Sequence, residues 1–358
     1  MKKNSLVKAA GWGLLFCFIG QTRNAGAEVV SVYARKDILR RAKVWRKVDV
    51  ASRDTLNGPQ GEGAYAFNEK VPCKYEEKDP MHPLGGHSPK FPCWDASGER
   101  LKVKYNHSEV FGEVAATRLF WALGFYAERM YSVQIVCENC PKDPWTDDGT
   151  QKRATRTFSM ATVQKRLKGT PIEYKEGLSW GFDELKYISE KSGGSSKAQV
   201  DALKLLSVLV NHVDNTANQQ LLLCPEGDAN CAHPIAYVTD LGGTFGGQNG
   251  TTNFRNWSRK KSVWKDPKKC IADFKGTSAD YRDPKISEGG RKFLSGLLEQ
   301  LTDKQLYDLF KSARFDVGAK EEYPIVTEGG KARSVTIDDW VREFKRRRKE
   351  IAAVRCPK

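Results

Sequence analysis

The spacing of hydrophobic residues predicts strands in the first half of the chain and helices in the second. Residues 99–105, ERLKVKY, alternate between apolar and polar side chains, which is the pattern of a strand with one buried face. Leu101 and Val103 occupy that face, whereas Lys102 and Lys104 project from the other. Two further strands are expected at residues 130–137 and 157–167.

A helix is expected at about residues 109–123, between a candidate N-cap at Ser108 and a C-terminal glycine at Gly124. This segment is apolar on nearly every side, so the helix should be buried. Its polar exceptions in the first half, Glu109 and Glu113, are four residues apart and share one face. A buried helix with acids near its start should therefore follow the lysine-bearing strand.

Beyond about residue 171 the pattern becomes helical. Residues 196–213 carry an apolar stripe at helical spacing: Val200, Leu203, Leu206, Leu209 and Val213. Helical patterns return at residues 289–301, 303–315 and 337–351. Strands followed by helices predict an α+β protein with two lobes. The strand-rich lobe would span residues 28–170, and the mainly helical lobe residues 171–358.

A polar corner, HVDNTANQQLLL at residues 212–223, follows the striped helix and continues into a strand. Read alone, it is an ordinary turn, because Asp and Asn are common turn residues. The strand at its end and the segment PIAYVTDL flank a connection that contains Cys224 and Cys231, which predicts a hairpin. The second strand of that hairpin ends at Asp240, before the glycine-rich stretch GGTFGG.

The first 27 residues have the features of a secretory signal peptide. Lys2 and Lys3 precede an apolar core, and Ala25–Ala27 forms a small-residue cleavage signal. No later segment approaches the length of a membrane span, so the mature chain is expected to have none. The predicted location is periplasmic or extracellular.

Eight cysteines remain after the predicted signal: Cys73, Cys93, Cys137, Cys140, Cys224, Cys231, Cys270 and Cys356. An even number in an exported chain favours disulfides, although eight cysteines allow 105 pairings. The local pairs Cys73–Cys93 and Cys224–Cys231 are expected. The motif CENC, at residues 137–140, is compatible with a bridge, a redox pair or half a zinc site.

The formal net charge of +15 falls to +11 once the four cations of the predicted signal are removed. This excess indicates an anionic surface or partner. The chain contains no zinc finger, RNA-binding aromatic motif or basic zipper, so no specific nucleic-acid signal is present. Residues 344–355, FKRRRKEIAAVR, are interpreted as a solvated helix face.

Taken in order, these features resemble the protein-kinase-like superfamily, particularly its atypical HipA-type, lipid-kinase-like and secretory-kinase-like branches. HVDNTANQ is similar to a catalytic loop, and TDLGG to the metal-binding Asp-Phe-Gly segment. The segments GEVAATRLFWALGF and GGHSPKFPC also resemble a group of uncharacterised exported bacterial proteins. The resemblance implies a two-lobed kinase-like fold and a phosphotransferase that uses ATP and Mg²⁺ or Mn²⁺ on an unknown phospho-acceptor.

The resemblance also implies roles for individual residues. Asp214 would accept or orient the substrate hydroxyl. Lys104, or alternatively Lys102, would hold the nucleotide phosphates and would be steadied by Glu113.

The implied metal ligand is Asp240, assisted by Asn218 or Gln219. Backbone and hydroxyl donors over the phosphates would come from Gly85, Gly86 and Ser88.

Three departures leave a second hypothesis open. The family's metal-binding Asn, five residues after the catalytic Asp, is Gln219 here, and Asn218 comes one position earlier. The usual Arg before the catalytic Asp is Val213, and the Asp-Phe-Gly segment is Asp-Leu-Gly. The chain could therefore be an inactive kinase-fold binding protein of the envelope or secretome. A third hypothesis, thiol–disulfide exchange at CENC, lacks a surrounding thioredoxin-like pattern.

Overall fold

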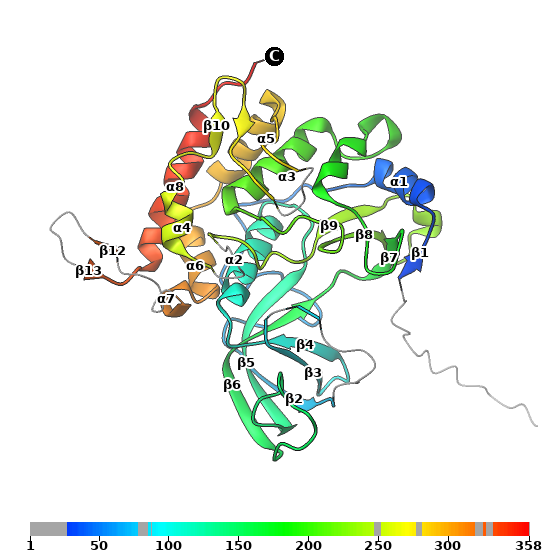
Figure 1. The fold of residues 1–358 in the computed structure, drawn as a ribbon, viewed down its shortest axis with the longest axis vertical. Helices are drawn as coiled ribbons and strands as arrows, with labels where there is room; N and C mark the ends of the chain where they lie inside the picture. Colours follow the sequence, from blue (N-terminus) through cyan, green and yellow to red (C-terminus); the bar gives the residue numbers. More distant parts are fainter. Residues whose placement is uncertain are drawn as a thin grey trace, which may run out of the picture.

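The computed structural model describes residues 27–77, 85–86, 88–246, 252–276, 281–318, 325–326 and 332–357. Nearly all of the predicted signal peptide, residues 1–26, lies outside these ranges. The protein has the expected α+β composition, with a strand barrel in the lower part of Figure 1 and most of the helices above it.

Five strands form the closed barrel, in the order β2-β3-β4-β6-β5, with β2 and β5 parallel where it closes. Their bounds are β2 (Lys70–Tyr75), β3 (Lys90–Asp95), β4 (Arg100–Lys104), β5 (Arg129–Cys140) and β6 (Ala154–Lys165). Apolar side chains, among them Leu101 and Val103, fill the interior. The alternating pattern of residues 99–105 therefore predicted the strand and its buried face correctly.

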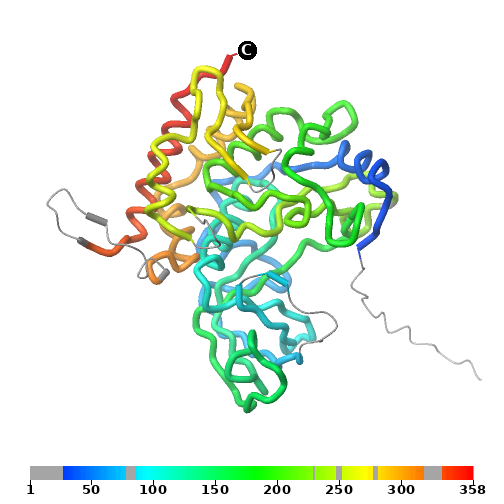
Figure 2. Tube along the Cα trace, in the orientation of Figure 1, coloured from blue at the N-terminus to red at the C-terminus, as the bar shows by residue number. Residues whose placement is uncertain are grey.

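The second sheet has the order β1-β7-β8-β9. Its strands are β1 (Glu28–Val29), β7 (Gly169–Glu173), β8 (Gln220–Pro225) and β9 (Ile235–Val238), and β8 and β9 form the predicted antiparallel hairpin. Strand β1 pairs with β7 in parallel, so the blue N-terminal segment lies against the green chain that contains β7 (Figure 2).

Eight helices are found in the described residues: α1 (Val32–Arg41), α2 (Ser108–Ala122), α3 (Lys197–Val210), α4 (Phe254–Arg259), α5 (Glu288–Glu299), α6 (Asp303–Ser312), α7 (Phe315–Gly318) and α8 (Ile337–Ala353). Short 3₁₀ turns occur at η1 (Phe182–Tyr187), η2 (Glu190–Ser192) and η3 (Ala229–Cys231). Short strand pairs are β10 (Trp264–Asp266) with β11 (Ile271–Ala272), and β12 (Ile325–Val326) with β13 (Ala332–Arg333). None of these helices combines the length and apolar character needed to cross a bilayer.

Two helix boundaries differ from expectation. The N-cap of α2 is His107 rather than Ser108, and its side chain makes no capping bond. Helix α3 ends before the polar corner, because Asn211 adopts the left-handed conformation with φ of 57°. Val213 therefore lies outside the helix, and Asn211 turns the chain towards the segment that contains Asp214.

Four disulfides brace the fold. The predicted pairs Cys73–Cys93 and Cys224–Cys231 are both present, and Cys137 bonds Cys140. A bridge at this position contradicts the zinc alternative for CENC, because a metal ligand must be a free thiolate.

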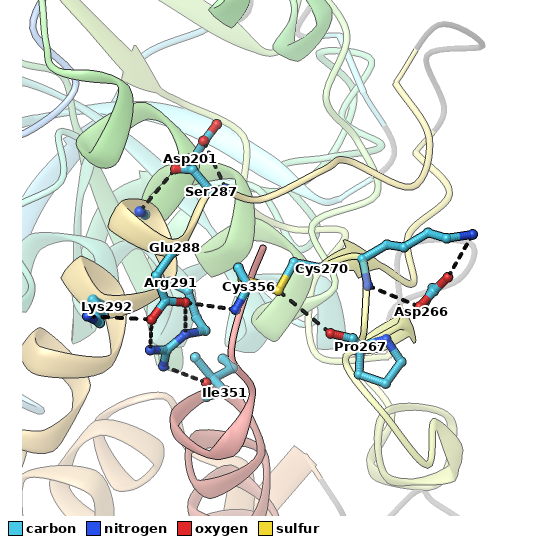
Figure 3. Close-up of a disulfide and its surroundings, with 12 residues drawn as sticks. Asp201, Asp266, Pro267, Cys270, Ser287, Glu288, Arg291, Lys292, Ile351 and Cys356 are labelled. Carbon is cyan, nitrogen blue, oxygen red and sulfur yellow. Dashed lines mark hydrogen bonds and ion pairs between the residues drawn. A yellow bond between two sulfur atoms is a disulfide. The ribbon is translucent and has the colours of Figure 1, made fainter. Parts of the chain in front are cut away.

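The fourth disulfide joins Cys270 to Cys356 across 86 residues and was not predicted. Figure 3 shows the C-terminal tail beside the start of α5. The backbone N–H of Cys356 donates to Glu288 Oε2 at 2.9 Å, and Arg291 binds the same carboxylate at 2.8 and 2.9 Å. The tail is therefore anchored to the start of α5, which is itself bound to α3 because the N–H of Ser287 donates to Asp201.

Candidate active site

The centre of the candidate site is a buried ion pair between β4 and α2. Nζ of Lys104 donates to both carboxylate oxygens of Glu113, at 2.6 Å each. Lys104 is 4 % exposed and Glu113 is fully buried. Burial opposes the charge of Lys104, but the carboxylates of Glu113 and Asp240 outweigh it and raise the pKa of Lys104 above its usual value. The ammonium is therefore positive and fixed in position.

Lys102, the alternative phosphate-binding residue, lies on the same strand face but has no ion pair with Glu113 among the described residues. Burial, followed by repulsion from Lys104, lowers the pKa of Lys102 to about 8, while Glu128 opposes the shift. Burial also raises the pKa of Glu128 to about 7. Of the two lysines, Lys104 is thus the one that is paired with Glu113.

Asp240 lies two residues beyond the end of β9 and interacts electrostatically with this pair. Burial disfavours its ionisation, but Lys104 and the backbone N–H of Gly242 hold the pKa of Asp240 below its usual value. The Gly242 N–H donates to Oδ1 of Asp240 at 3.2 Å. In the part of the chain that the structure describes, no residue donates a hydrogen bond to Oδ2 of Asp240. Asp240 therefore presents an ionised oxygen to the site.

The polar corner connects Asp214 to Asp240 through Gln219. The side-chain amide of Gln219 donates to Oδ2 of Asp214 at 3.1 Å. Its backbone carbonyl accepts from the Thr239 hydroxyl at 2.8 Å and from the Asp240 N–H at 3.4 Å. Asn218, in contrast, is exposed, and its side-chain oxygen accepts from Thr216 at 2.5 Å.

The glycines after Asp240 allow close approach of neighbouring segments. A Cβ atom on Gly242 would overlap the side chain of Glu109. A Cβ atom on Gly243 would lie 3.2 Å from Cγ2 of Val213 and 3.6 Å from Cβ of Asp214. The glycine segment therefore lies between the first turn of α2 and the polar corner. This arrangement brings Asp214 and Asp240 into the same region as the Lys104–Glu113 pair.

Glu109 belongs to this region, although sequence reasoning gave it no role. Burial raises the pKa of Glu109 to about 7, and repulsion from Asp240 and Glu113 adds to the effect. Its spacing of four from Glu113 on one helix face was the signal that could have identified it.

Lys90 is a second residue that sequence reasoning missed. It stands directly opposite Lys104 in the β3–β4 ladder and is 6 % exposed. Its Nζ donates to the carbonyl of Gly85 at 2.7 Å. Burial and repulsion from Lys104 lower the pKa of Lys90, while Asp240 and Glu113 oppose the shift. The signal in the sequence was its place at the end of GGHSPK, at the start of a strand.

The predicted phosphate loop is described only in part, because His87 and residues 78–84 lie outside the described ranges. Gly85 and Gly86 are exposed, and Gly86 has a φ of 89°, a conformation that favours glycine. Ser88 is buried, with 3 % of its surface exposed. Lys90 ties this turn to the barrel through its bond to Gly85.

The site offers few side chains that could hold a divalent metal. The described residues contain no cluster of three or more His, Cys, Asp and Glu side chains able to hold an ion. Mg²⁺, however, is usually held by one or two carboxylates together with substrate phosphates and water. Asp240, with an ionised carboxylate and the neighbouring amide of Gln219, fits that mode of binding, whereas Asn218 is turned to Thr216.

No protein-family model and no curated protein match this chain. Among solved structures, a proinflammatory kinase of Helicobacter pylori, CtkA, is 11 % identical with a TM-score of 0.41. The match covers 79 % of this chain and 95 % of that chain. A Golgi casein kinase with Mn and ADP bound is 13 % identical with a TM-score of 0.33, over 80 % of this chain and 73 % of that one. Both similarities are remote, so the roles of the residues rest on the contacts described above.

Proposed function

We propose that the chain is an exported kinase-like phosphotransferase that moves a phosphoryl group from ATP to an acceptor hydroxyl. The observation that carries this proposal is the buried Lys104–Glu113 ion pair. The ionised Asp240 interacts electrostatically with Lys104 of this pair. A desolvated, oriented ammonium beside a carboxylate is the arrangement that phosphate binding and charge stabilisation require.

In this proposal Lys104 and Lys90 bind the phosphate oxygens, and Glu113 prevents Lys104 from turning away. Asp214 accepts the proton of the acceptor hydroxyl while the hydroxyl oxygen forms a bond to the γ-phosphorus. The bond from that phosphorus to the β–γ bridging oxygen breaks, and ADP leaves with the bonding electrons. Gln219 orients the Asp214 carboxylate for this proton transfer.

A divalent metal, Mg²⁺ or Mn²⁺, would be held by Asp240 with help from Gln219. When bound, it would neutralise charge on the phosphate oxygens.

Four disulfides support an oxidising location, because such bonds persist mainly outside the cytosol. Export to the periplasm or the extracellular space is therefore part of the proposal.

The decisive experiment is a thermal-shift titration of the purified chain with ATP and Mg²⁺ or Mn²⁺. The unfolding temperature should rise with nucleotide and metal, because a ligand that binds only the folded state stabilises it. Asp240→Asn should reduce the rise, while Asp228→Asn, at an acid of the remote hairpin connection, should keep it. No shift with either metal would overturn the proposal.

A second candidate function is a kinase-fold protein that binds without catalysis. The observation in its favour is that the family's metal-binding Asn is replaced by Gln219, whose amide is bound to Asp214. This candidate predicts a nucleotide-induced shift without any transfer of labelled phosphate. Transfer that is lost in Asp214→Asn would exclude it.

A further inference from the structure

We propose that the groove between α6 and α8 is a docking site for an acidic segment of a partner protein. The groove encloses about 690 Å³. The two helices lie side by side in Figure 1, and Lys345 of α8 reaches Asp303 of α6 at 2.8 Å. This surface is separate from the residues of the candidate active site, so its occupant does not depend on the proposed function.

One wall of the groove is a row of cations on a single face of α8. Arg342, Lys345, Arg346 and Lys349 line the groove at positions i, i+3, i+4 and i+7. Residues at this spacing form a continuous stripe along a helix. Lys304 of α6 adds a fifth cation from the opposite wall.

Two of these cations, Arg342 and Arg346, also bind acids of the protein that lie behind them, whereas Lys345 binds the exposed Asp303 on the groove itself. Arg342 contacts Asp339 at 2.5 Å, and Arg346 contacts Glu343 at 2.7 Å. Asp339 is 4 % exposed and Glu343 is 9 % exposed, so both carboxylates face inward. The side chain of Arg342 is itself 68 % exposed. A guanidinium has five N–H donors, and Arg342 uses one of them on Asp339, so it can bind a second carboxylate from outside. The donors of Arg346 already bond Glu343, Glu350 and two backbone carbonyls, so Arg346 contributes mainly its positive charge.

Lys349 is the cation most available to a partner. It is exposed and lines the groove, and it forms no ion pair with any residue in the described ranges. An incoming carboxylate would therefore have no internal competitor at this position.

The groove also offers an apolar contact. Tyr307 of α6 lines it with 43 % of its surface exposed, and Val341 of α8 lies between the helices. Exposed aromatic side chains beside cations are typical of protein-binding surfaces. An acidic segment that carries one apolar side chain matches both features.

The shape and the rim charges favour a peptide over other polyanions. A concave groove between two helices suits a chain segment better than the flat face of a bilayer. Asp303 and Asp338 also line the groove, and they would repel the uninterrupted phosphates of a nucleic acid. A peptide can place a neutral or basic side chain at these two positions.

The test measures binding of a fluorescein-labelled ten-residue peptide to the purified chain by fluorescence anisotropy. The peptide consists of Glu and Asp interrupted by one central Phe and two neutral Ser residues. Binding should weaken about tenfold or more as NaCl rises from about 50 to about 300 mM, because exposed ion pairs are screened by salt. The triple variant Arg342→Glu, Lys345→Glu, Lys349→Glu should bind at least about tenfold more weakly, which equals about 1.4 kcal/mol. The single variant Lys349→Glu should also weaken binding, and it leaves the ion pairs among the described residues intact.

The matched control is the triple variant Lys47→Glu, Lys191→Glu, Lys268→Glu, which changes the net charge equally at exposed positions elsewhere. It should bind the peptide like the unaltered chain. Equal loss in both triple variants would show a general charge effect and overturn the proposal. It would also be overturned if the peptide fails to bind while phosphatidylglycerol vesicles or a single-stranded oligonucleotide bind through the groove.

Discussion

The side-chain amide of Gln219 donates a hydrogen bond to Oδ2 of Asp214 at 3.1 Å, while its backbone carbonyl accepts from the N–H of Asp240. One residue thus connects the two acids that the proposed chemistry needs. The amide at this position therefore has a positioning role that does not depend on whether it also binds metal.

Gln219→Ala should lower kcat for phosphate transfer about tenfold, which corresponds to about 1.4 kcal/mol and the loss of one hydrogen bond. KM for ATP should rise by less than kcat falls, because Asp240 remains as the main metal ligand whereas Asp214 loses the bond that orients it. Steady-state kinetics with labelled ATP provide both values. Asn218→Ala is the matched control, since that exposed amide contacts Thr216 instead. Equal losses in both variants would contradict a positioning role for Gln219.

Lys104→Met should destabilise the fold by about 3–5 kcal/mol, because it leaves the carboxylate of Glu113 buried without its partner. The double variant Lys104→Met, Glu113→Leu should recover much of this loss, since neither partner of the pair is left buried and unpaired. Urea unfolding of the single and double variants measures the difference. If the double variant loses as much as the two single variants combined, the pair is not the source of the cost.

Lys90→Met should weaken ATP binding about tenfold, and it should leave the free protein as stable as before or more stable. The reason is that burial lowers the pKa of Lys90, so its charge is costly until an anion arrives. A thermal-shift titration reports both effects. Lys74→Met, on an exposed position of the same barrel, is the control and should change neither.

His212 should make the fold sensitive to acid. Burial lowers the pKa of His212 from 6.5 to about 4, although Asp240 opposes the shift. The unfolded chain therefore binds a proton at a higher pH than the folded chain does. Neutral His212 therefore adds to the free energy of unfolding, and this stabilisation is complete above pH 6.5. About 3 kcal/mol of it is lost as the pH falls towards 4.

Unfolding free energies of His212→Gln at pH 7.5 and about pH 4.5 check this sign. The variant should lose less stability on acidification than the unaltered chain does. His233→Gln removes an exposed imidazole and should behave like the unaltered chain. If His212→Gln loses more unfolding free energy on acidification than the unaltered chain does, His212 is not neutral and buried in the folded protein.

The variant Cys270→Ser, Cys356→Ser should lose about 4 kcal/mol, because this disulfide closes a loop of 86 residues and so restricts the unfolded chain strongly. The variant Cys137→Ser, Cys140→Ser opens a separation of only 3 residues and should lose about 2 kcal/mol. Guanidinium unfolding compares the two. A smaller loss for the long-range pair would show that loop length does not set the effect.

The sequence alone determined features that depend on near neighbours. Alternation at residues 99–105 predicted β4 and its face, because side chains in a strand project to opposite sides. Local cysteine spacing predicted Cys73–Cys93 and Cys224–Cys231. The resemblance of HVDNTANQ and TDLGG to kinase motifs also made Asp214 and Asp240 candidates.

Only the tertiary structure decided which residues meet. Lys102 and Lys104 share one strand face, and the docking of α2 is what pairs Lys104 with Glu113. The position of Lys90 opposite Lys104 depends on strand register, and the bridge from Cys270 to Cys356 depends on packing across 86 residues. No local pattern encodes these contacts, because they arise from how distant segments bury their apolar faces together.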